Sequence, residues 1–275
     1  MTPKTSDLTT DLTTDPVSEP VAEPTADPAA GPATHANADF GQVAPALERA
    51  AHAITGASCV LFDFDGPICG LFAGHRAPHI AERLIGWLTE RGIVVPLAEA
   101  ERRDPHAVLR AVGSLHPEDS AVVRGLEQAL TEEELHATAS AAPTPYVDEL
   151  IRRWSARGVP LAVATNNSPL AVTRYVERRG LAECFDRHVY GRTTDLARLK
   201  PDPDCLNRAL RALGADPAKS LMIGDTPSDL YAAQRAGVAF LGYAKDEYRV
   251  ARLRRAGAET VVDTLAEVLG LVERG

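Results

Sequence analysis

The chain has 275 residues, of which 45% are hydrophobic and 24% charged, as in an ordinary globular protein with a sizeable buried core. Its formal net charge of −9 argues against a nucleic-acid or membrane-surface protein, because both need a basic face. No apolar run approaches the roughly 18 residues of a membrane span. The 4 cysteines are scattered and form no CxxC pattern, which indicates reduced thiols and a cytoplasmic location.

The first part of the chain differs in composition from the rest. Residues 1–38 are mostly Pro, Ala, Thr and acidic residues, and we expect a disordered tail because they cannot bury enough apolar surface to offset the entropy lost on ordering. The sequence becomes amphipathic near residue 40. SCVLFDF at 58–64 is then typical of a short buried strand, with a turn at Asp65-Gly66.

A long stretch without a recognisable strand follows this first strand. From 67 to 143, apolar residues recur at three- and four-residue spacing between glycines and prolines, which predicts a series of helices. Thr131 and Glu134 have the spacing of a capping box, which predicts the start of one of these helices nearby.

Strands and helices alternate after Pro145. Apolar strands are predicted at 159–165, 187–191, 220–225, 238–244 and 259–263, with helices between them. Continuous apolar strands separated by helices are typical of a parallel sheet covered on both faces. The predicted fold is therefore α/β, with a doubly wound, Rossmann-like core formed by 39–66 and 144–275. The segment 67–143 would be an all-helical cap inserted after the first strand.

Polar residues stand at the carboxyl ends of these strands, where open parallel sheets form their sites. The residues at the strand ends are Asp63, Asp65, Thr165, Asn166 and Asp225. Lys200 stands at the start of the helix before the strand at 220–225, and Asp229 stands early in the helix that follows this strand. Because all of these positions fall at one edge of the sheet, we expect the side chains to lie close together.

This set of side chains suits phosphoryl transfer. Residues i and i+2 of an extended segment point the same way, so Asp63 and Asp65 can face one pocket. Two close carboxylates separate into an ionised nucleophile and a protonated acid. Adding Asp225 makes a cluster of oxygen ligands that favours a hard divalent cation such as Mg2+. Lys200 and the Thr165 hydroxyl would supply donors to a transferring phosphoryl group.

At this point the sequence resembles the haloacid dehalogenase superfamily over about residues 57–245. Four motifs occur in the order of that family: DFDG at 63–66, an apolar strand ending in Thr165, Lys200 before Pro201, and GDTPSD at 224–229. The resemblance implies that Asp63 is the nucleophile and a metal ligand. It implies that Asp65 acts first as general acid and then as base, and that its backbone also touches the metal.

The resemblance also implies roles for the remaining residues. Thr165 and Lys200 would hold the phosphoryl oxygens, and we assign Asn166 to the same phosphate site although an Asn-Asn pair is also typical of a turn. Asp225 would bind Mg2+. Asp229 would support the metal site or orient Lys200, or would simply be an acidic residue favoured at a helix start.

The predicted activity is Mg2+-dependent hydrolysis of the phosphate monoester of a small metabolite, through an aspartyl-phosphate. Dehalogenases of the superfamily lack the equivalent of Asp65, so the resemblance implies its phosphatase branch. Two alternatives stay open, a phosphotransferase or phosphosugar mutase and a non-catalytic binding protein on the same fold. Phosphosugar mutases of the superfamily tend to use a cap lysine, and none occurs in 67–143, so the resemblance disfavours a mutase. An arginine of that segment, such as Arg76, Arg83, Arg102 or Arg103, could hold a second phosphate instead.

Substrate contacts and assembly are less well defined by the sequence. The segment that directly follows the first motif leaves the pocket, so we expect contacts from Phe72, Gly74, His75 and Arg76. We expect no nucleic-acid or membrane partner, and the sequence does not define the oligomeric state.

Overall fold

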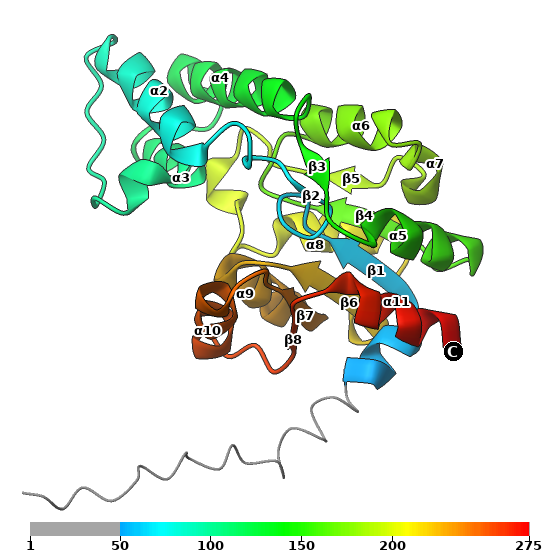
Figure 1. Ribbon diagram of the computed structural model, residues 1–275. Helices are drawn as coiled ribbons and strands as arrows, with labels where there is room; N and C mark the ends of the chain where they lie inside the picture. Colours follow the sequence, from blue (N-terminus) through cyan, green and yellow to red (C-terminus); the bar gives the residue numbers. More distant parts are fainter. Residues whose placement is uncertain (1–49, 275) are drawn as a thin grey trace, which may run out of the picture. The chain divides into compact units, whose positions relative to one another are not determined.

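The computed structural model of the protein describes residues 50–274, so the predicted tail at 1–38 lies outside the described residues. At its centre is a six-stranded parallel sheet in the order β5-β4-β1-β6-β7-β8 (Figure 1). Its strands are β1 (Cys59–Phe62), β4 (Leu161–Ala164), β5 (Val189–Tyr190), β6 (Ser220–Gly224), β7 (Ala239–Tyr243) and β8 (Val261–Val262). Each lies within a predicted strand, which confirms the predicted fold class.

Strand β1 is buried on both faces because it contributes to two cores. Val60 and Phe62 pack into one hydrophobic cluster, and Cys59 and Leu61 pack into the other. The chain adds β4 and β5 on one side of β1 and then β6 to β8 on the other. This reversal of direction opens a crevice at the carboxyl end of β1, the usual place for a ligand in such sheets.

Helices cover both faces of the sheet, as continuous apolar strands require. One face is covered by α5 (Val147–Ala156), α6 (Pro169–Arg178), α7 (Ala182–Phe185) and α11 (Leu265–Arg274). The other is covered by α8 (Asp204–Leu213) and α9 (Pro227–Ala236), with α10 (Glu247–Arg255) beside α9 and β8. In the part of the chain that the structure describes, no helix is long and apolar enough to cross a bilayer.

Three further helices form a layer with its own hydrophobic cluster, and we call them the cap helices. They are α2 (Ala77–Thr89), α3 (Pro105–Leu115) and α4 (Ala121–Ala137), with a short 3-10 turn at Glu101–Arg103. Helix α4 is continuous and begins after Ser120, whose hydroxyl accepts a hydrogen bond from the Val123 N–H at 3.2 Å. The predicted capping box at Thr131 is therefore wrong, because Thr131 and Glu134 lie inside this helix.

Two short strands were not expected in the segment 67–143. β2 (Cys69–Gly70) and β3 (Ala142–Pro143) pair in an antiparallel sheet where the chain leaves the core and where it returns. The prediction that this segment contains only helices is thus wrong at its two ends. A two-residue strand has no measurable periodicity, so sequence pattern cannot detect it.

Close packing within the cap helices gives a test of the described fold. A Cβ added at Gly125 of α4 would lie 2.7 Å from the Trp87 ring of α2, whereas one added at Gly86 would meet nothing within 4 Å. We expect Gly125→Ala to destabilise the protein by about 1–3 kcal/mol through overpacking. Gly86→Ala should stabilise it by up to about 1 kcal/mol through helix propensity. Urea unfolding of wild type and both variants measures these changes in the free energy of unfolding. The same change in both variants would contradict the described packing of Gly125 against Trp87.

Candidate active site

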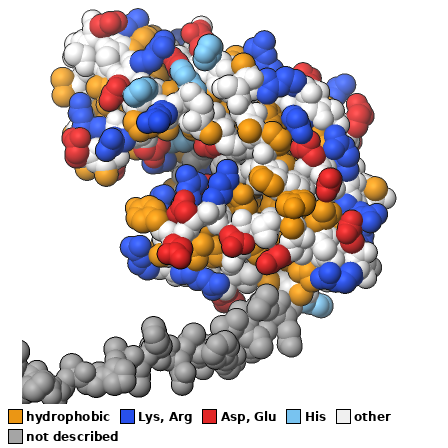
Figure 2. Space-filling model, in the orientation of Figure 1, with side chains coloured by type: hydrophobic (Ala, Val, Ile, Leu, Met, Phe, Trp, Pro, Cys, Tyr) orange, Lys and Arg blue, Asp and Glu red, His pale blue; other side chains and the backbone are white. Residues whose placement is uncertain are grey.

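A cavity of about 310 Å³ lies between the cap helices and the carboxyl edge of the sheet, and Figure 2 shows the recess with basic side chains on its lower wall. Its lining includes all seven residues singled out from the sequence: Asp63, Asp65, Thr165, Asn166, Lys200, Asp225 and Asp229. Strands β1, β4 and β6 and the loop before α8 bring them together, as expected for strand ends along one edge of a sheet.

Lys200 is buried at the centre of this group. Its Nζ donates to Asp63 Oδ1 at 2.8 Å and to the Ala164 carbonyl at 3.0 Å, and it lies 2.5 Å from Asp229 Oδ1. Burial alone would lower the pKa of Lys200, but the charges of Asp229 and Asp63 outweigh that effect and raise it. Lys200 therefore remains a cation that neutralises part of the carboxylate cluster.

Asp229 serves two structural purposes with its two oxygens. Oδ2 accepts hydrogen bonds from the Thr226 N–H at 3.0 Å and hydroxyl at 2.7 Å, which completes a capping box at the start of α9. Oδ1 faces Lys200. A Cβ at Gly224 would lie 2.5 Å from the Asp229 Cβ, so this close approach requires glycine. The helix-start and lysine-orienting interpretations of Asp229 thus both describe the structure.

The two aspartates of the first motif differ in their surroundings. Burial raises the pKa of Asp63, the charge of Asp229 raises it further, and Lys200 opposes both effects. Burial and the neighbouring Asp63 raise the pKa of Asp65 to about 6, while its Oδ1 accepts a hydrogen bond from the Leu71 N–H at 2.7 Å. A carboxyl with a pKa near 6 suits general acid–base catalysis near neutral pH.

The carboxylates fit a divalent cation. Oxygens of Asp63, Asp225 and Asp229 lie within 4.8 Å of one another. Asp225 Oδ1 is buried without a hydrogen-bond partner, and burial followed by the nearby carboxylates raises the pKa of Asp225 well above its ordinary value. A hard cation would satisfy that oxygen and offset the repulsion. Because Asp229 already binds Lys200 and caps α9, Asp63 and Asp225 are the better ligands.

The loop after β4 is held by side-chain hydrogen bonds. The Thr165 hydroxyl donates to Asn167 Oδ1 at 2.9 Å. The Asn166 amide bonds the backbone of Lys200 on both sides, accepting from its N–H at 2.7 Å and donating to its carbonyl at 3.2 Å. Any contact of Asn166 with a phosphoryl group would therefore come from its backbone, while its side chain positions Lys200.

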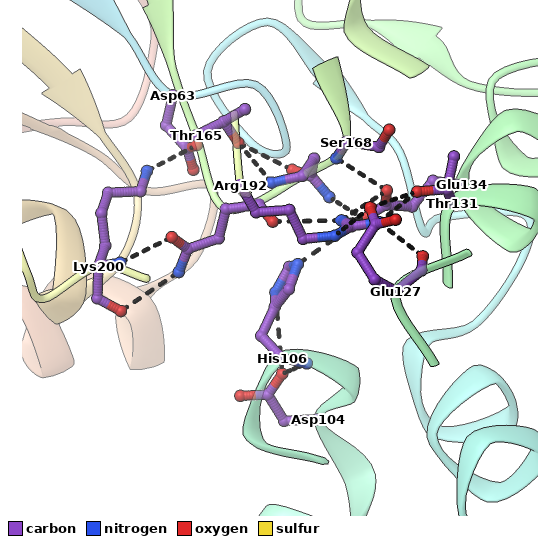
Figure 3. A network of polar contacts seen from close by, with 12 residues as sticks. Asp63, Asp104, His106, Glu127, Thr131, Glu134, Thr165, Ser168, Arg192 and Lys200 are labelled. Atoms are coloured by element: carbon purple, nitrogen blue, oxygen red, sulfur yellow. Dashed lines mark hydrogen bonds and ion pairs between the residues drawn. The ribbon is translucent and has the colours of Figure 1, made fainter. Parts of the chain in front are cut away.

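A buried ion pair joins α4 of the cap helices to Arg192 after β5, and its carboxylate also contacts the loop after β4 (Figure 3). Arg192 Nη1 lies 2.7 Å and 2.8 Å from the two carboxylate oxygens of Glu134 in α4, and its Nη2 donates to the Thr131 hydroxyl at 2.7 Å. Glu134 also accepts hydrogen bonds from Asn167 Nδ2 and from the Ser168 N–H, each at 2.9 Å. The side chains of Arg192 and Glu134 are both fully buried.

Sequence reasoning missed this pair and several residues of the cavity wall. His106 of α3 and Tyr248, Arg249 and Arg252 of α10 line the cavity. The expected substrate contacts Phe72, Gly74, His75 and Arg76 do not, and His75 Nε2 instead lies 2.5 Å from Glu133 Oε2 within the cap helices. Arginine and glutamate are usually exposed, so no pattern marked Arg192 and Glu134 as buried.

Known proteins share both this sequence pattern and this fold. A family model described as haloacid dehalogenase-like hydrolase matches residues 57–237. Phosphoglycolate phosphatase of Rhodospirillum rubrum is 31% identical over 229 residues, which cover 76% of this chain and 88% of that protein. A protein of Dickeya dadantii named Probable phosphatase IndB is 33% identical over 159 residues, which cover 57% of this chain and 68% of that protein.

A solved structure gives the same result for the fold. CbbY from Rhodobacter sphaeroides in complex with phosphate aligns with a TM-score of 0.57 at 23% identity, over 79% of this chain and 99% of that one. The protein thus has an α/β fold with a carboxylate-lined cavity at the switch point of its sheet. The chain belongs to the haloacid dehalogenase-like hydrolase family.

The buried pair gives a stability prediction. Arg192→Met leaves Glu134 buried and unpaired, so we expect a loss of about 3–5 kcal/mol. The double variant Arg192→Met/Glu134→Met should recover only part of this loss, because Asn167 Nδ2 and the Ser168 N–H then lose their acceptor. Although burial opposes it, Arg192 together with His106 lowers the pKa of Glu134 from 4.5 to about 2. The pair therefore stabilises the protein fully above the unfolded pKa of 4.5 and loses this effect as pH falls toward 2.

Chemical unfolding of wild type and both variants between pH 7 and pH 3 measures these effects. The gap between wild type and Arg192→Met should narrow as the solution becomes more acidic. A single variant as stable as wild type at pH 7, or a gap that widens in acid, would contradict the described ion pair.

Proposed function

We propose that the protein is a Mg2+-dependent phosphatase that hydrolyses a phosphate monoester of a small molecule through an aspartyl-phosphate on Asp63. The observation that carries this proposal is the arrangement around Asp63: Lys200 at 2.8 Å, and Asp65 with a pKa of about 6 in the same cavity. The two sequence relatives described above add support, since both are named as phosphatases.

The proposed reaction has two steps. Asp63 attacks the phosphorus, a P–O bond forms, and the bond to the leaving oxygen breaks while Asp65 donates a proton to that oxygen. Asp65, now a carboxylate, then takes a proton from a water molecule that attacks the same phosphorus. The bond between phosphorus and Asp63 breaks, and inorganic phosphate leaves with the original carboxylate restored.

Other residues hold the phosphoryl group and balance its charge. Lys200 is a fixed cation beside the nucleophile, and we assign it and Thr165 to the non-bridging oxygens. Bound Mg2+, with Asp63 and Asp225 as ligands, would neutralise further negative charge on those oxygens. Asn166 and Asp229 act by positioning Lys200, through the backbone and the ammonium respectively.

The cap helices suit a small substrate. A cavity of about 310 Å³ is at the lower end of the range for small-molecule sites, and it suits a small substrate better than a protein segment or a duplex. We propose that 67–143 acts as a cap that excludes bulk water during the first step. A cytoplasmic location remains a prediction.

Loss of the nucleophile tests the proposed reaction. We expect Asp63→Asn to lower the rate of phosphate release by about a thousandfold or more, because the amide cannot form the aspartyl-phosphate. Release of inorganic phosphate is measured with Mg2+ over a panel of phosphorylated sugars, nucleotides and short acids. Release that survives the substitution would contradict the assignment of Asp63. A folded protein that releases no phosphate from any compound would favour a transferase or a binding protein.

Metal binding is tested without activity. We expect Mg2+ to raise the melting temperature of the wild type, since a ligand at a hundred times its Kd stabilises the folded state by about 2.7 kcal/mol. Asp225→Asn should abolish this shift because it replaces a carboxylate ligand with an amide. Glu90→Gln removes the same charge from an exposed residue that does not line the cavity, and it should keep the shift. An unchanged Mg2+ response in Asp225→Asn would contradict the proposed metal site.

A further inference from the structure

The cavity has an acidic inner part and a basic outer part. The carboxylates of the inner part are deeply buried, as at Asp63, which is only 7% exposed. Helix α10 on the core side contributes Tyr248, Arg249 and Arg252 to the wall, and α3 of the cap helices contributes His106. Helices α3 and α10 belong to opposite sides of the recess, as Figures 1 and 2 show.

The cations of this wall differ in what they already bind. Lys200 is occupied by Asp63 and Asp229. Arg249 Nη1 lies 3.0 Å from Asp225 Oδ2, and its Nε lies 3.5 Å from Asp246 Oδ2. Arg252 alone among them lines the cavity without an ion pair or side-chain hydrogen bond to any residue within 50–274. Its guanidinium charge is therefore available to a ligand in the cavity.

His106 offers a second polar group on the opposite wall. Its Nε2 is buried without a hydrogen-bond partner among the described residues and lies 3.7 Å from Glu134 Oε1, beyond hydrogen-bond distance. This nitrogen lies within ion-pair distance of Glu134, whose charge Arg192 already neutralises, and a ligand oxygen would give it the hydrogen bond that the contact with Glu134 lacks. The carboxylates of the cavity lining all belong to the inner cluster, namely Asp63, Asp65, Asp225 and Asp229, so none of the residues that line its outer part repels an anion.

We propose that Arg252, with His106 opposite, forms a subsite for a second anionic group of the substrate. The preferred substrates are then small phosphate monoesters that also carry a carboxylate or a second phosphate. This inference rests on the proposed phosphatase function and deepens it, since it names the substrate class. It assigns selectivity for that class to α10 of the core, whereas the sequence left open an arginine of the segment 67–143 for a second phosphate.

Three two-carbon compounds isolate the second anionic group. They are phosphoglycolate with a carboxylate, ethylene glycol bisphosphate with a second phosphate, and 2-hydroxyethyl phosphate with a neutral hydroxyl. Calorimetric binding is measured in the Asp63→Asn background at one fixed Mg2+ concentration, where turnover does not interfere and any loss of metal affinity is common to all compounds and variants. We expect the anionic compounds to bind about tenfold or more tightly than the neutral one. Addition of Arg252→Gln should remove most of that preference and leave the Kd of the neutral compound within about twofold. The ratio of the Kd values of phosphoglycolate and ethylene glycol bisphosphate shows whether the subsite prefers a carboxylate or a second phosphate.

The matched control is Arg255→Gln on the same helix, whose Nε donates to the Ala251 carbonyl and which does not line the cavity. It should leave all three Kd values unchanged. Equal binding of neutral and anionic compounds, or equal weakening of all three by Arg252→Gln, would overturn the subsite.

Turnover by the wild-type enzyme provides a separate measurement. Arg252→Gln should raise KM for the anionic compounds while kcat changes little, because the contact is made equally in the ground state and the transition state. Charge-selective binding without any phosphate release would overturn the proposed phosphatase and retain the subsite. Phosphate release without charge-selective binding would retain the proposed phosphatase and overturn the subsite.

Discussion

Four carboxylates share the buried carboxyl edge of β1 and β6, and their mutual repulsion governs the site. In a region of low dielectric, burial and neighbouring carboxylates raise the pKa values of Asp63, Asp65 and Asp225, and Lys200 is the one lysine that lines the cavity. The pKa of Asp65 rises to about 6 through burial first and the charge of Asp63 second, while Lys200 keeps its proton. A divalent cation would offset the repulsion between these carboxylates. The proposed nucleophile, acid and metal site thus share one electrostatic environment.

The second buried cluster is balanced by its own residues. Arg192 neutralises Glu134, and backbone and side-chain donors of the loop after β4 occupy the remaining carboxylate positions. This cluster therefore has no need of a ligand, and it joins helix α4 to the loop that carries Thr165. The contrast is informative, because a polar cluster left with an orphaned oxygen, as at Asp225, indicates a binding site.

The sequence pattern was sufficient to predict the sheet and the edge at which the seven polar residues meet. The apolar strands punctuated by glycine and proline could only form a covered parallel sheet, and motif residues at strand ends must share an edge. The contacts across the cavity were not predictable. Arg192, Glu134 and His106 come from separate elements, and only the three-dimensional packing of α3 and α4 against the core brings them together. The Thr131–Glu134 spacing matched a capping box by coincidence, whereas the real one pairs Thr226 with Asp229.

The pairing of β2 with β3 means that the chain leaves the core and returns to it at neighbouring positions. Topologically, the cap helices replace the loop of a β-hairpin, so their presence leaves the strand order of the parent sheet unchanged. That loop can therefore change in length without reordering the strands, provided that the contacts of Glu134 with Arg192 and with the loop after β4 are kept. Away from this one buried contact, the cap helices and the core can diversify separately, which allows one hydrolytic core to serve many substrates.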